Sequence, residues 1–348
     1  MLSGREGDRI PVDFWASRGL RERLPGETGL SFEAFLDEHD VDLRYIEGPE
    51  YVGPPLPEGV DIWGVGRRTV EVQTPLGVEY YQEVVSSPLA AAASVDEVES
   101  YDGWPAAEWF RYDVVERQCK GILEEGRVVV FMGDRLNRIA QLKPAMYIRG
   151  MEQIYIDMAA DPDVAKAVFA KVRAFYSEYL RRILEAAGGG IDIVLTGDDF
   201  GGQNGPLIAP EMWDGFLRDG FAEYISIISQ FAARSMHHTC GSVIDIIPRM
   251  IECGLDVLQS LQPEAAGMEP EALKDRFGGK LSFQGGVSIQ KTMPFGSRDE
   301  VSRQVKTLAD TLGAGGGYIF GTAHNIQADT PLENVKALLA AYSEYGRY

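Results

Sequence analysis

The chain has 348 residues, 45% of them hydrophobic and 25% charged, which is an ordinary composition for a folded globular protein. Its 53 acidic and 33 basic residues give a formal net charge of −20, and such a field disfavours nucleic acid and anionic membrane surfaces as partners. Three cysteines indicate no disulfide framework, residues 1–9 lack the apolar core of a signal peptide, and no apolar stretch is long enough to span a membrane, so we expect a cytoplasmic protein.

The first part of the chain predicts a strand, a helix and a second strand. Residues 9–17 are read as a strand, with Pro11 near its start, where a missing backbone N–H is tolerated. A short helix is expected over residues 31–39 and a strand over residues 42–46. We expect both strands to belong to the central sheet of the molecule.

A β-hairpin is predicted next. Residues 68–74 and 78–84 alternate polar and apolar side chains on either side of Pro75-Leu76-Gly77, as two strands joined by a tight turn do. The hairpin lies within residues 51–105, which we interpret as an insertion that covers one end of a single domain formed by residues 1–348.

From residue 107 onward, helices and strands alternate regularly. The strands are apolar throughout, which favours parallel pairing with both faces covered. Helices are expected over residues 107–125, 150–160, 164–187, from about 210, 243–253 and 331–345, and strands over 127–133, 191–197, 231–238, 256–262, 281–283 and 317–321. With the two early strands this makes eight, the number of a (β/α)8 TIM barrel; an open doubly wound sheet is the alternative.

His238 and Cys240 stand two residues apart at the end of a predicted strand. Side chains at positions i and i+2 of a strand leave the same face, so the imidazole and the thiol would point at one spot. The chain has only four histidines and three cysteines, so the pairing of these residue types favours a metal site. The alternative is a buried His and a buried Cys that fill a strand end, since free Cys is often buried.

Other polar residues follow the ends of the predicted barrel strands. The active site of a barrel collects at the carboxyl ends of its strands, so these residues would meet at one mouth. One carboxylate of the pair Asp198 and Asp199 should face the mouth and the other away, unless both serve as a helix cap or turn. The residues selected by this rule are Asp198, Asp199, His238, Cys240, Gln259, Gln262, Gln284 and His324.

His238, Cys240 and His324 would form a three-ligand zinc set with the fourth position open to water or a substrate thiol. Asp199 or Glu264 could supply an oxygen ligand. The fifth and eighth barrel strands are not neighbours, so hydrogen bonding to substrate is an equal alternative for His324. His237 should point away from the mouth, and Cys253, inside a helical stretch, is expected to be a core thiol.

These motifs resemble the uroporphyrinogen decarboxylase superfamily, which includes zinc-dependent methylcobamide:coenzyme M methyltransferases and related corrinoid-linked methyltransferases. The resemblance covers nearly the whole chain and implies a (β/α)8 barrel with its site at the carboxyl ends of the strands. The matching segments are Arg9-Ile-Pro-Val, Asp61-Ile-Trp-Gly-Val, Ser87-Pro-Leu, Gly197-Asp-Asp-Phe-Gly with Gln203, Pro206-Leu-Ile-Ala-Pro-Glu, His238-Thr-Cys-Gly-Ser, Gln284-Gly-Gly, His324, Asp329-Thr-Pro and Glu333-Asn-Val.

Two activities within the superfamily compete. The decarboxylases need no metal and carry an Arg-Gln-Ala-Gly-Arg stretch after the first strand, where this chain reads Trp15-Ala-Ser-Arg-Gly-Leu-Arg and keeps only Arg18 and Arg21 as cations. The methyltransferases carry a His-x-Cys zinc motif on the fifth strand, which His238-Thr-Cys matches. Their third ligand is a Cys near the end of the eighth strand, aligned here with His324.

The resemblance therefore favours a zinc-dependent methyltransferase that moves a methyl group between a small thiol, methoxy or N-methyl compound and a corrinoid protein. A partner would carry the corrinoid, because no cobalamin-binding module is visible, and the chain could form a homodimer. Asp199 and Gln203 would orient substrate or water, while Asp198, Gln262 and Gln284 would contact substrate. The alternatives are decarboxylation of a tetrapyrrole or other polycarboxylate, and a barrel that binds a metal or small tetrapyrrole without catalysis.

Overall fold

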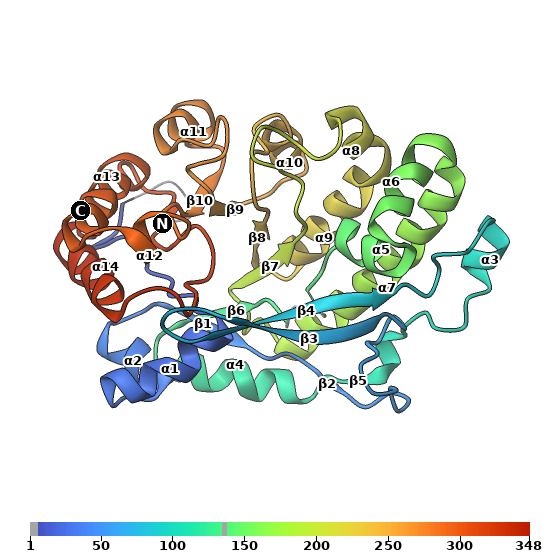
Figure 1. Ribbon diagram of the computed structural model, residues 1–348, viewed down its shortest axis with the longest axis horizontal. Helices are drawn as coiled ribbons and strands as arrows, with labels where there is room; N and C mark the ends of the chain where they lie inside the picture. Colours follow the sequence, from blue (N-terminus) through green and yellow to red (C-terminus); the bar gives the residue numbers. More distant parts are fainter. Residues whose placement is uncertain (1–5, 134–137) are drawn as a thin grey trace.

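A ring of parallel strands lies at the centre of the computed structural model, which describes residues 6–133 and 138–348 (Figure 1). Residues 1–5 of the polar N-terminal stretch lie outside the described residues. The seven strands of the sheet follow one another in chain order and pair in parallel. They are β1 (Leu43–Ile46), β6 (Val128–Phe131), β7 (Ile193–Gly197), β8 (Arg234–His238), β9 (Val257–Leu261), β10 (Ser282–Gly285) and β11 (Tyr318–Ile319).

The ring is closed by a segment that is not a continuous strand. Val12 forms an isolated parallel bridge with Phe320 beside β11, and its carbonyl accepts the N–H of Asp42 beside β1 at 3.0 Å. The prediction of a strand over residues 9–17 is therefore wrong in form, although the segment occupies the predicted place. Pro11 has no N–H to give, which interrupts the ladder at this seam.

Helices cover the outside of the ring, and most lie between consecutive strands (Figure 1). The predicted helix over residues 107–125 is wrong in its first part, which forms a 3-10 turn (Ala107–Trp109) and the short strand β5 (Phe110–Arg111). The helices are α1 (Arg18–Thr28), α2 (Phe32–Glu38), α3 (Val95–Glu99), α4 (Val114–Glu124), α5 (Leu142–Arg149), α6 (Met151–Ala160), α7 (Pro162–Ala187), α8 (Pro210–Phe216), α9 (Arg218–Gln230), α10 (Ile247–Glu252), α11 (Pro270–Phe277), α12 (Thr292–Phe295), α13 (Arg298–Leu308) and α14 (Leu332–Tyr345).

Two apolar cores follow from this layering. A large cluster of buried residues fills the space between the helices and the outer face of the strands. A smaller cluster fills the inside of the ring with one or two side chains from each of six strands: Leu43, Val130, Ile193, Leu195, Met236, Val257 and Ile319. Strands buried on both faces explain why the sequence shows continuous apolar runs, and the fold is a TIM-type α/β barrel.

The predicted hairpin is present as an antiparallel pair, β3 (Gly66–Gln73) and β4 (Val78–Ser86). It forms a long two-stranded ribbon that reaches from the neighbourhood of α1 toward α7 (Figure 1). A second small pair joins β2 (Glu50–Tyr51) to β5 (Phe110–Arg111). Within the described residues, no helix combines the length and the apolar character needed to cross a membrane.

Candidate active site

Strand β8 directs His237 out of the barrel and His238 into it. Met236 belongs to the core inside the ring, so His238, two residues later, faces the same way and lies at the mouth. The Nδ1 atom of His238 lies 2.5 Å from Oε1 of Gln259, its paired neighbour on β9. An amide oxygen only accepts, so Nδ1 carries the proton and Nε2 presents a lone pair to the mouth.

His237 faces the helices, as its place in the strand predicts. Its ring stacks on Phe200, and its Nδ1 atom lies 2.8 Å from the hydroxyl of Thr196. Burial lowers the pKa of His237 to about 3, so the imidazole is neutral at physiological pH. This histidine packs the outer layer and does not reach the mouth.

Cys240 lies beside His238 in the turn that follows β8. Its Sγ atom is 3.5 Å from Nε2 of His238 and 3.7 Å from the hydroxyl of Ser260. Burial and the nearby charge of Asp199 raise the pKa of the Cys240 thiol to about 12. Gly241 completes the turn at φ 75°, where a Cβ atom would lie 2.5 Å from the backbone of Gly201, so this tight turn requires glycine.

His324 comes to the same place from the segment after β11. Its ring centroid is 5.2 Å from that of His238 and 4.9 Å from that of Trp15, and its Nδ1 atom contacts the amide oxygen of Asn325. Burial lowers the pKa of His324 to about 4, and the pKa of His238 is also well below its ordinary value for the same reason. Both rings are therefore neutral at pH 7, which is the form that binds metals.

His238, Cys240 and His324 together have the composition of a zinc site. One ligand atom from each residue lies within 4.8 Å of the other two. Tetrahedral zinc with these ligand types separates ligand atoms by about 3.3–3.8 Å. The distance of 3.5 Å between Sγ of Cys240 and Nε2 of His238 already fits this range. The distances to His324 would fit after a side-chain shift of about 1 Å. The donor set and its convergence at the mouth thus fit a metal ion with an open coordination position.

The two adjacent aspartates have opposite surroundings. The carboxylate of Asp198 is 2% exposed and accepts the backbone N–H groups of Gln141, Leu142 and Lys143 at 2.6, 2.9 and 2.7 Å. These are the unpaired amides at the N-terminus of α5, so Asp198 anchors that helix to β7. Burial raises the pKa of Asp198 to about 6 despite these bonds.

Asp199 instead faces the mouth. Its Oδ2 atom pairs with Nζ of Lys143 at 2.6 Å, and its Oδ1 atom accepts the N–H of Cys240 at 3.0 Å and lies 3.7 Å from Nε2 of His238. Burial opposes ionisation of this carboxyl group, but the positive charge of Lys143 and the hydrogen bond from the N–H of Cys240 outweigh it and hold the pKa below its ordinary value. Asp199 is therefore an ionised carboxylate beside the ligand set.

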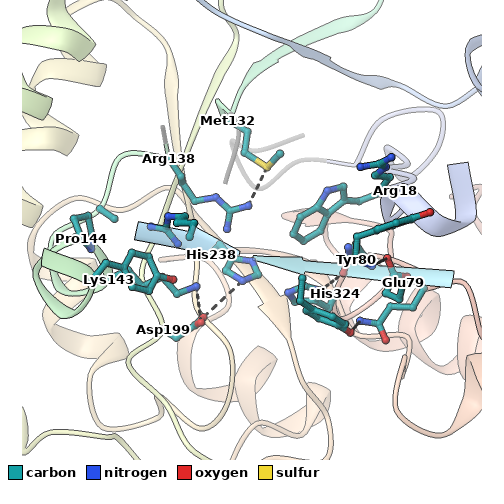
Figure 2. A pocket seen from close by; sticks show the side chains of 18 of the residues that line it. Arg18, Glu79, Tyr80, Met132, Arg138, Lys143, Pro144, Asp199, His238 and His324 are labelled. Carbon is teal, nitrogen blue, oxygen red and sulfur yellow. Dashed lines mark hydrogen bonds and ion pairs between the residues drawn. The ribbon is translucent and has the colours of Figure 1, made fainter. Parts of the chain in front are cut away.

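A cavity of about 490 Å³ opens over these residues (Figure 2). His238 and Asp199 lie at its centre, with Arg138 and Met132 on one side and Tyr80 with Arg18 on the other (Figure 2). The hairpin supplies one wall through β4, whose Glu79 accepts the hydroxyl of Ser17 at 2.7 Å and the N–H of Ala328 at 3.0 Å. Barrel and hairpin thus enclose the cavity together.

The other predicted residues lie outside the described cavity lining. Gln262 supports the Cys240 turn by accepting the N–H of Gly241 at 3.1 Å, and Gln284 lies inside the ring, where its Nε2 donates to Asp13 at 2.9 Å. Gln203 is exposed. Asp198, Gln203, Gln262 and Gln284 are absent from the described cavity lining, and their roles toward substrate stay predictions.

Several lining residues could not be selected by the strand-end rule. Lys143 is in the first turn of α5, Tyr147 is one turn further, Arg67 is on the hairpin, and Trp15 is in the closing segment. Their only signal in the sequence is their residue type. Arg18, noted as a remaining cation, does line the cavity, with its guanidinium 4.2 Å from the ring centre of Tyr80.

Comparison with known proteins places the chain in a family. The model of the uroporphyrinogen decarboxylase (URO-D) family matches residues 86–345. The chain belongs to this family. A uroporphyrinogen decarboxylase of Coxiella burnetii is 21% identical over 271 residues, which are 75% of this chain and 70% of that protein.

Proteins with a different activity are similar too. The methylcobamide:CoM methyltransferase MtaA of Methanosarcina barkeri is 28% identical over 167 residues, or 48% of this chain and 45% of that protein. A solved methyltransferase from Methanosarcina mazei superposes with a TM-score of 0.70 over 99% of this chain and 96% of that chain, at 20% identity. That likeness shows the fold, and the chain is a URO-D family enzyme for which methyl transfer and decarboxylation are both plausible.

Proposed function

We propose that this URO-D family chain is a zinc-dependent methyltransferase that moves a methyl group between a small thiol, methoxy or N-methyl compound and a corrinoid carried by a partner protein. The convergence of His238, Cys240 and His324 carries the proposal: one ligand atom from each lies within 4.8 Å of the others, and His238 and His324 line the cavity. Decarboxylation in the superfamily needs no such ligand set. The matches to methyltransferases support the same choice.

The chain's own residues prepare the site for a metal. Gln259 holds the proton of His238 on Nδ1, so Nε2 is free to coordinate, and the contact with Asn325 orients His324 in a similar way. When bound there, zinc supplies Lewis acidity, which lowers the pKa of a thiol or polarises the bond to a methyl group.

Asp199 and Lys143 act beside the ligands. The carboxylate of Asp199 lies within reach of a group held near His238 and can accept its proton, while Lys143 keeps that carboxylate ionised. Trp15 packs against both histidine rings and shields them from water on that side. These residues would bind and orient the substrate before the methyl group moves.

The direct test combines metal analysis with a methyl-transfer assay. The full-length protein should copurify with about one zinc per chain and should either methylate a small thiol from methylcobalamin or demethylate a methoxy or N-methyl compound with reduced cobalamin, followed by the visible absorbance of the cobalamin. His238→Ala and Cys240→Ser should abolish both zinc and turnover. Cys253→Ser is the matched control, because this thiol belongs neither to the ligand group nor to the described cavity lining. A metal-free enzyme whose turnover survives a chelator would contradict the proposal.

Decarboxylation of a porphyrinogen or other polycarboxylate is the second candidate. It is favoured by the cavity lining, in which the described residues supply four cationic side chains and two carboxylates, as binding of several substrate carboxylates requires. Incubation with uroporphyrinogen and chromatography of the products test it. Product formation that persists after zinc removal and in Cys240→Ser would select this activity.

A third reading is a barrel that binds a metal or a small tetrapyrrole without catalysis. It predicts that His238→Ala and Cys240→Ser leave every measurable turnover unchanged. Loss of turnover in either variant, with Cys253→Ser unaffected, would exclude it.

A further inference from the structure

The hairpin places an arginine in the cavity through a backbone irregularity. Gly66 pairs with Ser86 but Arg67 pairs with Val84, so Val85 is an extra residue and β4 carries a bulge at this point. Bulges redirect the side chains around them. The Arg67 side chain is only 8% exposed and lines the same cavity as His238 and His324.

A buried carboxylate and a partly buried ring hold the guanidinium of Arg67 from two directions. Its Nε atom donates to Oδ2 of Asp61 at 2.7 Å, and its central carbon lies 4.5 Å from the ring centre of Tyr147. The other oxygen of Asp61 accepts the N–H groups of Trp63 at 2.9 Å and Val65 at 3.1 Å, so the carboxylate is itself held rigidly. The plane of the guanidinium is therefore set without using its two terminal nitrogens.

Those terminal nitrogens have no hydrogen-bond partner within the described residues, in contrast to Nε. Two terminal nitrogens with N–H groups in one plane form the fork that binds a carboxylate or another oxyanion through paired bonds. The surroundings favour an anion too. Although the whole chain carries a net charge of −20, the described cavity lining has four cationic side chains against two carboxylates.

We propose that Arg67 binds an oxyanion of the substrate and that Asp61 is the residue that positions it. The ligand class is a small aromatic acid, because aromatic side chains dominate the remaining wall of the cavity. Those described in the lining are Trp15, Trp63, Tyr80, Tyr81, Tyr147 and Tyr176. The inference rests on the proposed function in that it names the substrate class for the same cavity.

Binding of simple probes tests this assignment without any turnover. Calorimetric titration of the full-length, chelator-treated protein with benzoate, benzenesulfonate and phenyl phosphate separates the three oxyanion sources, and neutral benzamide serves as reference. At least one anion should bind tenfold or more tightly than benzamide. Because the protein is metal-free in this experiment, the result tests anion binding even if the zinc proposal is wrong.

Variants then locate the anion. Arg67→Gln combined with Asp61→Asn removes both charges of the buried pair, which avoids an uncompensated charge, and should reduce anion affinity to that of benzamide. Arg67→Lys keeps a positive charge but loses the paired N–H groups, so its affinity for the anion should lie between those of the wild type and the double variant. Arg68→Gln is the matched control, since Arg68 is exposed and pairs with Glu83.

Asp61→Asn alone should lower the affinity for the anion several-fold and leave the affinity for benzamide unchanged, as expected of a positioning residue. Thermal melting of each variant confirms that it is folded. Equal anion affinity in the wild type and the folded double variant, or no preference of the wild type for any anion over benzamide, would overturn the proposal.

Discussion

The two walls of the cavity are built in different ways. The barrel wall includes residues at the ends of neighbouring strands, such as Gly197 and His238, which are held by the register of the sheet. The hairpin wall consists of residues held by buried side-chain contacts, such as Arg67 with Asp61 and Glu79 with Ser17. Under the proposals above, the barrel would bind the metal and the hairpin would select the substrate.

The largest expected effect is on zinc affinity, which should depend on the barrel wall and not on the hairpin wall. His324→Ala should lower zinc affinity on the order of 100- to 1000-fold, because one of three protein ligands is lost. Tyr80→Phe on the hairpin wall should leave zinc affinity unchanged. Competition titration with a fluorescent zinc chelator measures both. Equal zinc affinity in His324→Ala and wild type would show that His324 is not a ligand.

Unfolding measurements would sharpen the contrast between the two aspartates of the barrel wall. Asp198→Ala leaves three amides of α5 without a partner and should lower the free energy of unfolding by about 3 kcal/mol or more. Asp199→Ala should cost about 1 kcal/mol or less, since its ion pair with Lys143 is partly exposed. Urea denaturation gives both values. Similar losses in the two variants would contradict the assignment of Asp198 to the fold.

The interior of the barrel should respond to pH through Asp13. Burial raises the pKa of Asp13 to about 6, above the value of about 3.9 expected when unfolded. Well below pH 4 the group is protonated in both states. As pH rises from 4 to 6 the unfolded state ionises first, so the stability contributed by the protonated group is lost, up to about 3 kcal/mol.

Asp13→Asn should remove this dependence, so the variant should gain stability relative to wild type as pH rises from 4 to 7. The amide oxygen can still accept the hydroxyl of Tyr45 and the Nε2 of Gln284. Urea midpoints at several pH values measure the difference. Parallel profiles for the two proteins would show that Asp13 does not titrate in this range.

The smallest effect concerns the support of a ligand. Gln259→Leu removes the acceptor for Nδ1 of His238 and should lower zinc affinity about 10- to 100-fold. Gln262→Leu, which loses only a bond to the N–H of Gly241, is the control and should change it much less. Zinc competition titration again gives the comparison. An unchanged affinity in Gln259→Leu would mean that the histidine keeps its tautomer without this glutamine.

The barrel wall could be anticipated from the sequence because it depends on local periodicity. A strand has a two-residue repeat, so the opposite directions of His237 and His238 followed from position alone. Cys240 lies in the turn after β8, so its place beside His238 depends on that turn and not on the strand repeat. The convergence of these residues with His324 followed from the barrel rule. The repeat could not say which of Asp198 and Asp199 faces the mouth, because that depends on where α5 docks.

The hairpin wall could not be anticipated. Alternation predicted the strands β3 and β4, but the direction of Arg67 depends on a bulge that leaves no mark in the residue pattern. Lys143 reaches the mouth because Asp198, from another part of the chain, anchors α5. The closing segment was predicted as a regular strand, since its apolar residues fit one, whereas Pro11 leaves only scattered bonds with its neighbours.

This sparse closing seam has a consequence for local motion. Amides near Val12 and Phe320 have fewer ladder bonds around them than those of β7 and β8, so we expect the seam to open more readily and to exchange its hydrogens earlier. The same segment carries Trp15, which rests on both His238 and His324. Binding of a metal should therefore slow hydrogen exchange across the seam. The exchange rate of the closing segment would then indicate whether the metal site is occupied.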